Sequence, residues 1–253
     1  MKIIISPAKK MNDTEDFLPW DQLPVFIDRA ETIKNYLQGQ SYEALKTIWK
    51  CNDDIATLNQ GRIQSMSLTQ RLVPALLSYE GLQYQYMAPQ VFDKGQWEYV
   101  KKHLVILSGF YGVLRPTDGI TPYRLEMQAK LASPLEGAKN FYAYWGRAIY
   151  DELAKDTDLI LNLASKEYSK AIEKYVAPGK QMITCTFGTE VDGKVKVKAT
   201  EAKMARGEMV RYLAQHQAAD PAAIKQFDSM AYSFSEKHSG TSHFVFLKRT
   251  DAK

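Results

Sequence analysis

The segment LSGFYGVLRPTDGITPYRLEM, residues 107–127, is the stretch around which we expect this chain to fold. It follows an apolar run, residues 104–107, that indicates a buried strand or a short buried helix. Glycine permits positive φ and proline fixes φ, so their close spacing here predicts a loop of defined shape. These residues are Gly109, Gly112, Pro116, Gly119 and Pro122.

Charged side chains are interleaved with the glycines and prolines of this loop. They are Arg115, Asp118, Arg124 and Glu126. A rigid loop that holds charges in fixed positions is a common way to build a site. The alternative is an irregular surface connection whose charges are only solvated.

Bulk composition is that of a globular protein, with 45% hydrophobic and 25% charged residues over 253 positions. This length fits one large domain or two small ones, and we expect a single domain over residues 1–253. The net charge of +4 and the pI of about 8.8 are mildly basic. Binding to nucleic acid would therefore require the charge to be concentrated on one face.

The cysteines and the hydropathy predict a cytoplasmic protein. Cys51 and Cys185 are far apart and in no C-x-x-C arrangement, which excludes a disulfide framework and favours a reduced compartment. The apolar start is too short for a signal peptide, and no run approaches the roughly 18 apolar residues that span a bilayer. We expect no membrane association, and a monomer, although no pattern fixes the oligomeric state.

The periodicity predicts a mixed α/β (α+β) fold, with a mixed sheet surrounded by helices. A helical insertion is expected at about residues 25–100, where Ser41 and Asn52 are natural N-caps. The other expected elements are strands at 3–5, 159–164 and 241–248, a hairpin at 181–198, and helices at 140–155 and 200–215.

Polar residues follow two of the expected strands. Lys9 and Lys10 follow residues 3–5, and Ser165 and Lys166 follow the strand at 159–164. Ligands gather at the carboxyl ends of strands in open α/β sheets, and exposed helix N–H groups suit anions. These residues therefore form candidate ligand loops. The equally favoured alternative is that the lysines are only solvated and that Ser165 only caps a helix.

The expected helix at 200–215 adds two more cationic candidates. Lys203 and Arg206 are i,i+3 neighbours and share a face. Gly207 lies in mid-helix at a cost of roughly 1 kcal/mol relative to alanine. A close backbone approach or a kink would justify that cost.

Several motifs are absent. The chain has no phosphate loop, no G-x-G-x-x-G, no G-x-S-x-G and no H-E-x-x-H. The spacing of its histidines suggests neither zinc nor iron. We therefore expect no cofactor and no metal, and we keep a metal-handling protein as the least favoured hypothesis.

Five segments, taken together and in this order, resemble the YaaA-like family of peroxide stress resistance proteins. They are IISPAKKM, LSGFYGVLRPTDGITPYRLEM, FYAYWG, NLASKEY and KMARGEMVRYL. The resemblance runs from the first expected strand nearly to the C-terminus. It implies a cytoplasmic protein linked to survival under hydrogen peroxide, with DNA binding, a basic cleft and a helix-hairpin-helix-like element. It does not imply an established reaction.

The helix-hairpin-helix assignment is open to question. Such a motif binds DNA phosphate through backbone N–H groups of a Gly-apolar-Gly hairpin, whereas this chain has two residues between Gly109 and Gly112. The departure puts the hairpin in doubt more than it does DNA binding.

Our hypothesis is a protein that binds DNA, largely without sequence preference, through the phosphate backbone in a basic cleft. The candidate binding residues are Lys9, Lys10, Gly109, Gly112, Arg115, Arg124, Ser165, Lys166, Lys203 and Arg206.

The alternative is a glycosylase-like enzyme acting on a nucleotide or base in the same cleft. Asp118 would stabilise a cationic sugar, and Glu126 or Glu167 would activate water. The structural alternative for Asp118, which we favour, is that it caps a turn before Gly119.

Overall fold

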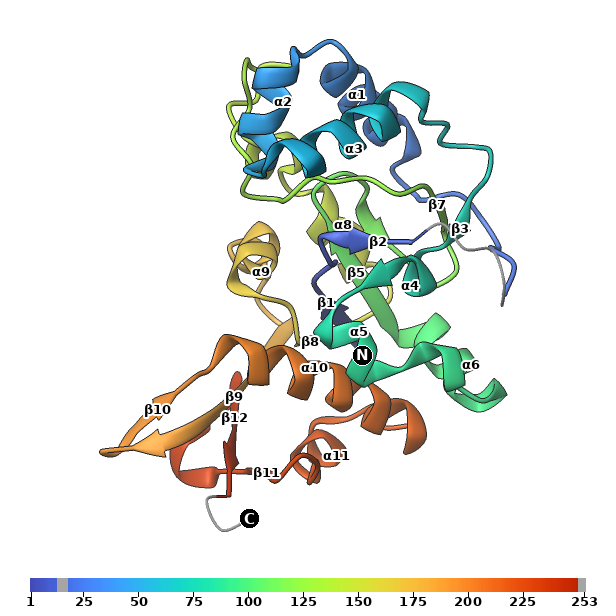
Figure 1. The fold of residues 1–253 in the computed structure, drawn as a ribbon. Coiled ribbons are helices and arrows are strands. Elements are labelled where there is room, and N and C mark those ends of the chain that lie inside the picture. The colour runs from blue at the N-terminus through green and yellow to red at the C-terminus, as the bar shows by residue number, and fades with distance from the viewer. Residues whose placement is uncertain (13–17, 250–253) are drawn as a thin grey trace.

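The computed structural model describes residues 1–12 and 18–249. It confirms the predicted fold class, a mixed α/β single domain in which helices surround a mixed sheet (Figure 1). None of the described helices combines the length and the apolar character needed to cross a bilayer.

The main sheet of the described residues has the strand order β11-β12-β9-β8-β1-β5-β6, with β10 paired to β9. The strands from β12 to β5 in this order are parallel, and β6, β10 and β11 are antiparallel additions. Their bounds are β1 (Lys2–Ile5), β5 (Leu104–Ser108), β6 (Gly112–Leu114), β8 (Leu159–Asn162), β9 (Gln181–Val191), β10 (Lys194–Lys196), β11 (Tyr232–Phe234) and β12 (His243–Lys248).

Two small sheets complete the strands, pairing β2 with β4 and β3 with β7. Their bounds are β2 (Lys10–Met11), β3 (Val73–Pro74), β4 (Tyr79–Glu80) and β7 (Gly119–Ile120).

The helices lie on both sides of the main sheet, with α9 on one side of β1 and α6 on the other (Figure 1). They are α1 (Ile27–Gln38), α2 (Tyr42–Trp49), α3 (Asp53–Ser65), α4 (Ala75–Ser78), α5 (Leu82–Met87), α6 (Lys94–His103), α7 (Phe141–Trp145), α8 (Ala148–Ala154), α9 (Lys166–Glu173), α10 (Ala199–Gln215) and α11 (Pro221–Lys225), with 3-10 turns η1 (Pro89–Val91) and η2 (Glu236–His238).

The centre of the core is β1, whose three isoleucines are completely buried. A strand paired on both edges and covered on both faces must be apolar throughout, and residues 3–5 satisfy this requirement. Its parallel neighbours are β5 and β8. The predicted strands at 3–5, 159–164 and 241–248 and the hairpin at 181–198 are confirmed, with bounds shifted by a few residues.

The region 25–100 is mainly helical, and its helices form groups with different neighbours. Helices α1, α2 and α3 pack together at one end of the molecule (Figure 1), while α5 and α6 pack against α10. The predicted caps are confirmed. Ser41 Oγ accepts the N–H of Ala44 at 3.2 Å, and Asn52 Oδ1 accepts that of Ile55 at 3.1 Å.

The single helix predicted over 140–155 is wrong, because the structure has α7 and α8 there. Gly146 separates them with φ of +52°, and its N–H closes α7 on the carbonyl of Tyr142. The apolar periodicity runs through the break and therefore hid it. Glycine readily adopts the positive φ that ends a helix here, and this was the missed signal.

The segment Leu104–Leu114 is a β-hairpin, so it does not form the helix-hairpin-helix that the resemblance implied. Both of its glycines have packing roles. A Cβ on Gly109 would press at 3.0 Å on the backbone of residues 125–127. Gly112 has φ of +72°, and a Cβ there would stand 2.7 Å from the ring of Trp145. The indole of Trp145 in turn donates to the carbonyl of Gly109 at 2.9 Å.

Close packing of α5 against α10 explains the glycine in mid-helix. A Cβ on Gly207 would overlap the carbonyl oxygen of Gln83 and stand 3.0 Å from the N atom of Met87. Of the two explanations for Gly207, a close backbone approach or a kink, the structure shows the close approach. It fixes the position of α10, and with it Lys203 and Arg206, relative to α5.

We expect Gly207→Ala to lower the free energy of unfolding by about 1–3 kcal/mol, because the added methyl group must push α10 away from α5. Gly61→Ala is the matched control. Gly61 lies inside α3 with open space around its Cα, so alanine should raise stability by up to about 1 kcal/mol. Urea unfolding of the variants measures both effects. Equal effects of the two substitutions would contradict the packing role of Gly207.

Candidate functional site

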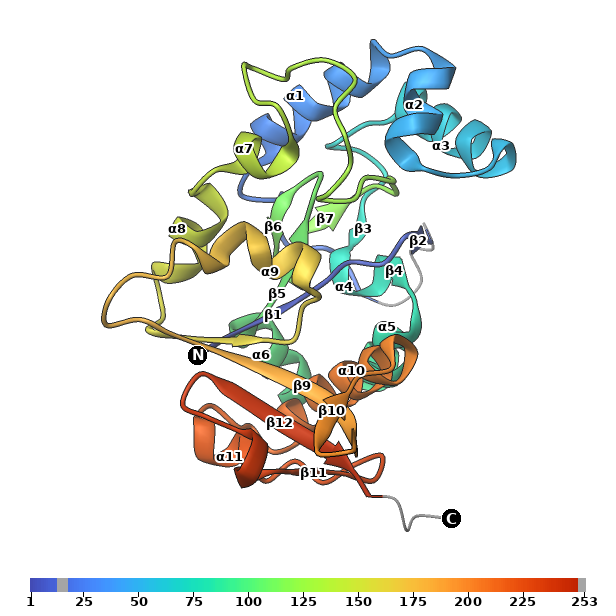
Figure 2. The same cartoon turned by 90° about the vertical axis from the view of Figure 1, so that its left-hand side faces the viewer.

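A cavity of about 380 Å³ opens at the carboxyl ends of β1 and β8. The chain leaves β1 toward β5 and leaves β8 toward β9, in opposite directions along the sheet. Such divergence opens a crevice in α/β sheets. The end of β1, α5, α10 and the start of α9 surround this region (Figure 2). The cavity is lined by residues 6–10, 80–84, 123–126, 165, 167, 168, 203 and 206.

Hydrogen bonds join the two strand ends below the cavity. The N–H of Ser165 donates to Ser6 Oγ at 2.8 Å, and the two hydroxyls lie 3.2 Å apart. Tyr84 of α5 donates its hydroxyl to the carbonyl of Ser6 at 2.9 Å. Ser165 occupies the N-cap position of α9, as predicted, but its side chain forms no capping bond to the helix. That hydroxyl therefore belongs to the cavity wall.

Two arginines line the cavity without a protein acceptor for the Nε atom. The Nε atoms of Arg124 and Arg206 are both buried and form no hydrogen bond with the described residues, among which neither arginine has an ion pair. Burial lowers the pKa of Arg206, but a guanidinium remains protonated in proteins. A buried cationic donor without an acceptor is costly, which makes both groups strong candidates for binding an anion.

A chain of buried hydroxyls fixes the loop that carries Arg124. The Tyr123 hydroxyl lies 2.6 Å from Ser108 Oγ and 2.7 Å from the hydroxyl of Tyr79. Burial raises the pKa of Tyr123 to about 12, so all of these groups are neutral near pH 7. The network ties residues 123–126 to the end of β5.

Carboxylates share the cavity with the cations. Glu126 forms an ion pair with Lys9, and Glu80 forms one with Lys10 at 2.5 Å. Burial, followed by the neighbouring charge of Glu126, raises the pKa of Glu167. The N–H of Gln128 donates to Glu167 Oε1 at 3.3 Å. The cleft is therefore mixed in charge. Lys9 and Lys10 are paired, whereas Arg124, Lys203 and Arg206 have no ion pair among the described residues.

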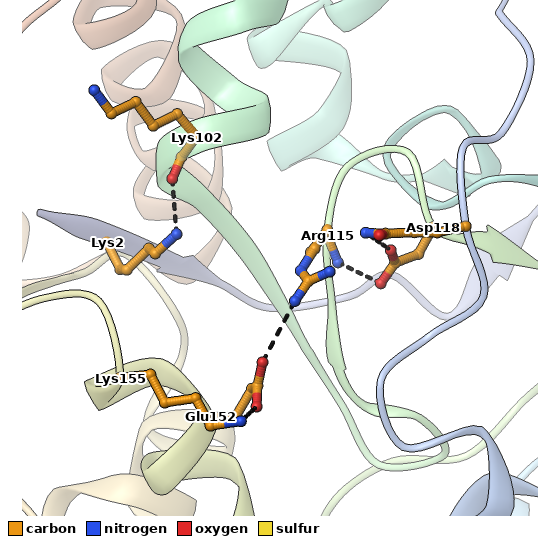
Figure 3. Close-up of polar contacts among 7 residues, drawn as sticks. Lys2, Lys102, Arg115, Asp118, Glu152 and Lys155 are labelled. Carbon is orange, nitrogen blue, oxygen red and sulfur yellow. Dashed lines mark hydrogen bonds and ion pairs between the residues drawn. The ribbon is translucent and has the colours of Figure 1, made fainter.

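Arg115 lies away from this cavity. The hairpin reverses the chain, so β6 carries Arg115 back toward the amino ends of the parallel strands. There it meets Glu152 at 3.5 Å, while Lys2 reaches the carbonyl of Lys102 nearby (Figure 3). The expectation that Lys9, Arg115 and Lys166 meet in one cleft is therefore wrong.

Lys166 also points elsewhere, pairing with Glu173 on the exposed surface of α9. Gly109 and Gly112 do not line the cavity and serve packing instead. The predicted residues that the structure does bring together are Lys9, Lys10, Arg124, Glu126, Ser165, Glu167, Lys203 and Arg206.

Asp118 is buried in a turn outside the cavity, as the structural alternative predicted. The N–H of Arg115 donates to its Oδ2 at 2.8 Å, and Gln22 Nε2 donates to its Oδ1 at 2.9 Å. Figure 3 shows the carboxylate turned toward the backbone of Arg115. The candidate catalytic carboxylates within the cavity are therefore Glu126 and Glu167.

Sequence reasoning missed the wall formed by residues 80–84 and a second cavity of about 370 Å³. The second cavity lies beside Thr121 and Pro122 and includes Arg62 and Arg71. The only local sequence feature in this wall is Gly81, and a glycine at that place predicts only a break between helices. Among the described residues, no group of three or more His, Cys, Asp or Glu side chains could hold a metal ion.

We expect Asp118→Asn to change how stability depends on pH. Burial raises the pKa of Asp118 to about 6, whereas an unfolded aspartate titrates at about 3.9. Between these values the folded chain holds a proton that the unfolded chain has lost, so wild-type stability falls as pH rises through this window. The fall should be on the order of 3 kcal/mol.

Asparagine does not titrate, so Asp118→Asn should lack this fall while keeping an oxygen for the N–H of Arg115. Urea unfolding at pH 4 and pH 7 compares the two proteins. Parallel pH profiles would show that Asp118 is not buried with a raised pKa.

Comparisons with known proteins agree with the motifs. The family model described as "Peroxide stress protein YaaA" matches residues 1–238. A UPF0246 protein of Lachnoclostridium phytofermentans is 53% identical over 248 residues, covering 98% of this chain and 96% of the relative. UPF0246 proteins of Agathobacter rectalis and Lactiplantibacillus plantarum are 51% and 50% identical, over 98% of this chain and 99% of each relative. The chain therefore belongs to the peroxide stress protein YaaA family.

Proposed function

We propose that this protein is a cytoplasmic DNA-binding protein that holds backbone phosphate in the cavity at the ends of β1 and β8. The observation that carries the proposal is a pair of arginines that line that cavity, Arg124 and Arg206, whose buried Nε atoms have no acceptor among residues 1–12 and 18–249. Arginine matches phosphate with two parallel N–H···O bonds, which also fixes its orientation. Lys203, one turn before Arg206 on α10, adds an exposed cation at the same site.

Charge balance supports an anion as the ligand. Five cationic residues line the cavity against three glutamates, and two of those glutamates are paired with Lys9 and Lys10. The cations left over are Arg124, Lys203 and Arg206. Contacts from such cations to backbone phosphate carry no sequence information, so we expect binding with little sequence preference.

Protection against peroxide would follow if the protein covered part of the DNA. A protein that covers the sugar-phosphate backbone shields it from oxidants formed nearby. The family name supports the link to peroxide, while the cavity supports the link to an anionic polymer.

A second candidate function is catalysis on a nucleotide or base in the same cavity. Glu126 and Glu167 favour it, because both carboxylates line the cavity that holds the arginines. Burial raises the pKa of Glu167, and a carboxyl group with a raised pKa is typical of groups that hold and release a proton in a site. One carboxylate could stabilise a cationic sugar while the other activates water.

The DNA-binding proposal predicts steep salt dependence. Each phosphate contact releases counterions, so Arg206→Gln should lower the slope of log K against log salt by about 1. The matched controls are Arg115→Gln and Lys166→Gln, which remove cations outside the cavity and should leave the slope unchanged. Fluorescence anisotropy with duplexes of two unrelated sequences, at several salt concentrations, measures this slope for each protein. Binding that ignores salt, or equal losses in the controls, would contradict the proposal.

The two candidate functions differ in turnover. We expect no released base or nucleotide when the protein is incubated with damaged duplexes, single strands and free nucleotides and the products are separated by chromatography. A product would favour the enzyme if Glu126→Gln or Glu167→Gln abolished it and left binding intact. A carboxylate that works in the transition state changes rate more than ground-state affinity.

A further inference from the structure

The cavity has the size of a ligand pocket rather than of a duplex interface. Its volume of about 380 Å³ is near the lower end for small-molecule sites. Specific protein–DNA interfaces bury on the order of 1,000 Å² of protein surface or more, which needs a longer track. One nucleotide, rather than a continuous duplex, fits the enclosed part of this site.

The lining suits the parts of a nucleotide. The cations Arg124 and Arg206, which have no ion pair among the described residues, suit a phosphate. Ser165 lines the same cavity at the N-terminus of α9, and helix N-termini suit anions. Leu82, Tyr84, Leu125 and Tyr168 provide apolar and aromatic surface for a base or sugar.

Glu167 is a hydrogen-bond acceptor in the cavity, and a site for inorganic phosphate alone would not need one. Its carboxylate has no ion pair within residues 1–12 and 18–249, and the donors that face it are backbone N–H groups of Met127 and Gln128, the latter at 3.3 Å. A carboxylate in an anion site is unfavourable unless the ligand also carries hydrogen-bond donors. Sugar hydroxyls and exocyclic amines of bases are such donors.

We propose that the cavity binds a single nucleotide bearing a terminal phosphomonoester, with the phosphate on Arg124 and Arg206 and the nucleoside toward Glu167. Two guanidinium groups match the two charges of a monoester better than the single charge of a backbone diester. The inference deepens the proposed DNA binding and rests on it for one source of the ligand, the phosphorylated end of a strand. A free nucleoside monophosphate is the other source.

Calorimetry at fixed ionic strength tests the site with three probes: 2′-deoxyadenosine 5′-monophosphate, 2′-deoxyadenosine and inorganic phosphate. The monophosphate should bind about tenfold or more tightly than either fragment. Arg124→Gln and Arg206→Gln should each weaken it about tenfold or more. Arg211→Gln is the matched control, because Arg211 lies on α10 outside the cavity and its loss should leave affinity unchanged.

Thermal unfolding of each variant, and Arg206→Lys as a variant that keeps the charge, separate loss of binding from loss of fold. Arg206→Lys should unfold like wild type and still bind the monophosphate more weakly, because lysine cannot form the bidentate pair. Inorganic phosphate that binds as tightly as the monophosphate, or unchanged affinity in both arginine variants, would overturn the inference.

A second arm separates the sources with a sealed dumbbell duplex, which has no ends, and the same duplex opened with a 5′-phosphate or a 5′-hydroxyl. The phosphorylated duplex should bind most tightly and be displaced by the monophosphate. Equal binding of all three without displacement would overturn the nucleotide site and leave the proposed DNA binding standing. Binding of the monophosphate without any duplex would support the site, identify a free nucleotide as its ligand and remove the proposed function.

Discussion

Burial of β1 between β5 and β8 is the constraint on which the rest of this structure depends. Its isoleucines exclude water from both faces. Because β5 and β8 run parallel to it, the carboxyl ends of all three strands lie at the same end of the sheet. The chain leaves β1 and β8 in opposite directions, and such divergence opens a crevice at that end of the sheet. The hydrogen bonds of Ser6 with Ser165 join the two ends and form the floor of the opening. The cavity is therefore a result of topology before any charged side chain is considered.

The cations differ in how the protein presents them. Lys9 and Lys10 are exposed and paired with glutamates, so salt in solution screens them strongly. Arg124 and Arg206 have buried Nε atoms, where screening is weaker and each hydrogen bond counts for more. The rim and the interior of the site should thus contribute differently to binding, with the rim attracting a ligand and the interior holding it.

The sequence predicted the features that depend on local pattern. The apolar strands, the hairpin at residues 181–198, the caps at Ser41 and Asn52 and the packing role of Gly207 could all be inferred from neighbouring residues. Five of the seven basic candidates also line the cavity, because strand ends and helix faces are local properties.

What could not be predicted depends on direction in space. The prediction for Arg115 failed because the reversal at the β5–β6 hairpin decides which end of the sheet it reaches. Lys166 begins the correct helix but points outward, and neither spacing nor composition fixes that angle. The wall at residues 80–84 comes from packing of α5 on α10, which links segments more than 100 positions apart. The helix break at Gly146 could have been predicted from the glycine, but the amphipathic pattern that continues through it favoured a single helix.

The backbone contact at Gly207 also has an entropic consequence. Because main chain meets main chain there, α5 and α10 cannot shift relative to one another through side-chain rotation. Arg206, the residue before Gly207, therefore starts from a backbone position that is already set, and only its side-chain torsions remain to be ordered when an anion arrives. Binding to such a preorganised group loses less conformational freedom than binding to a lysine on a loop, so affinity can be high even in a small cavity.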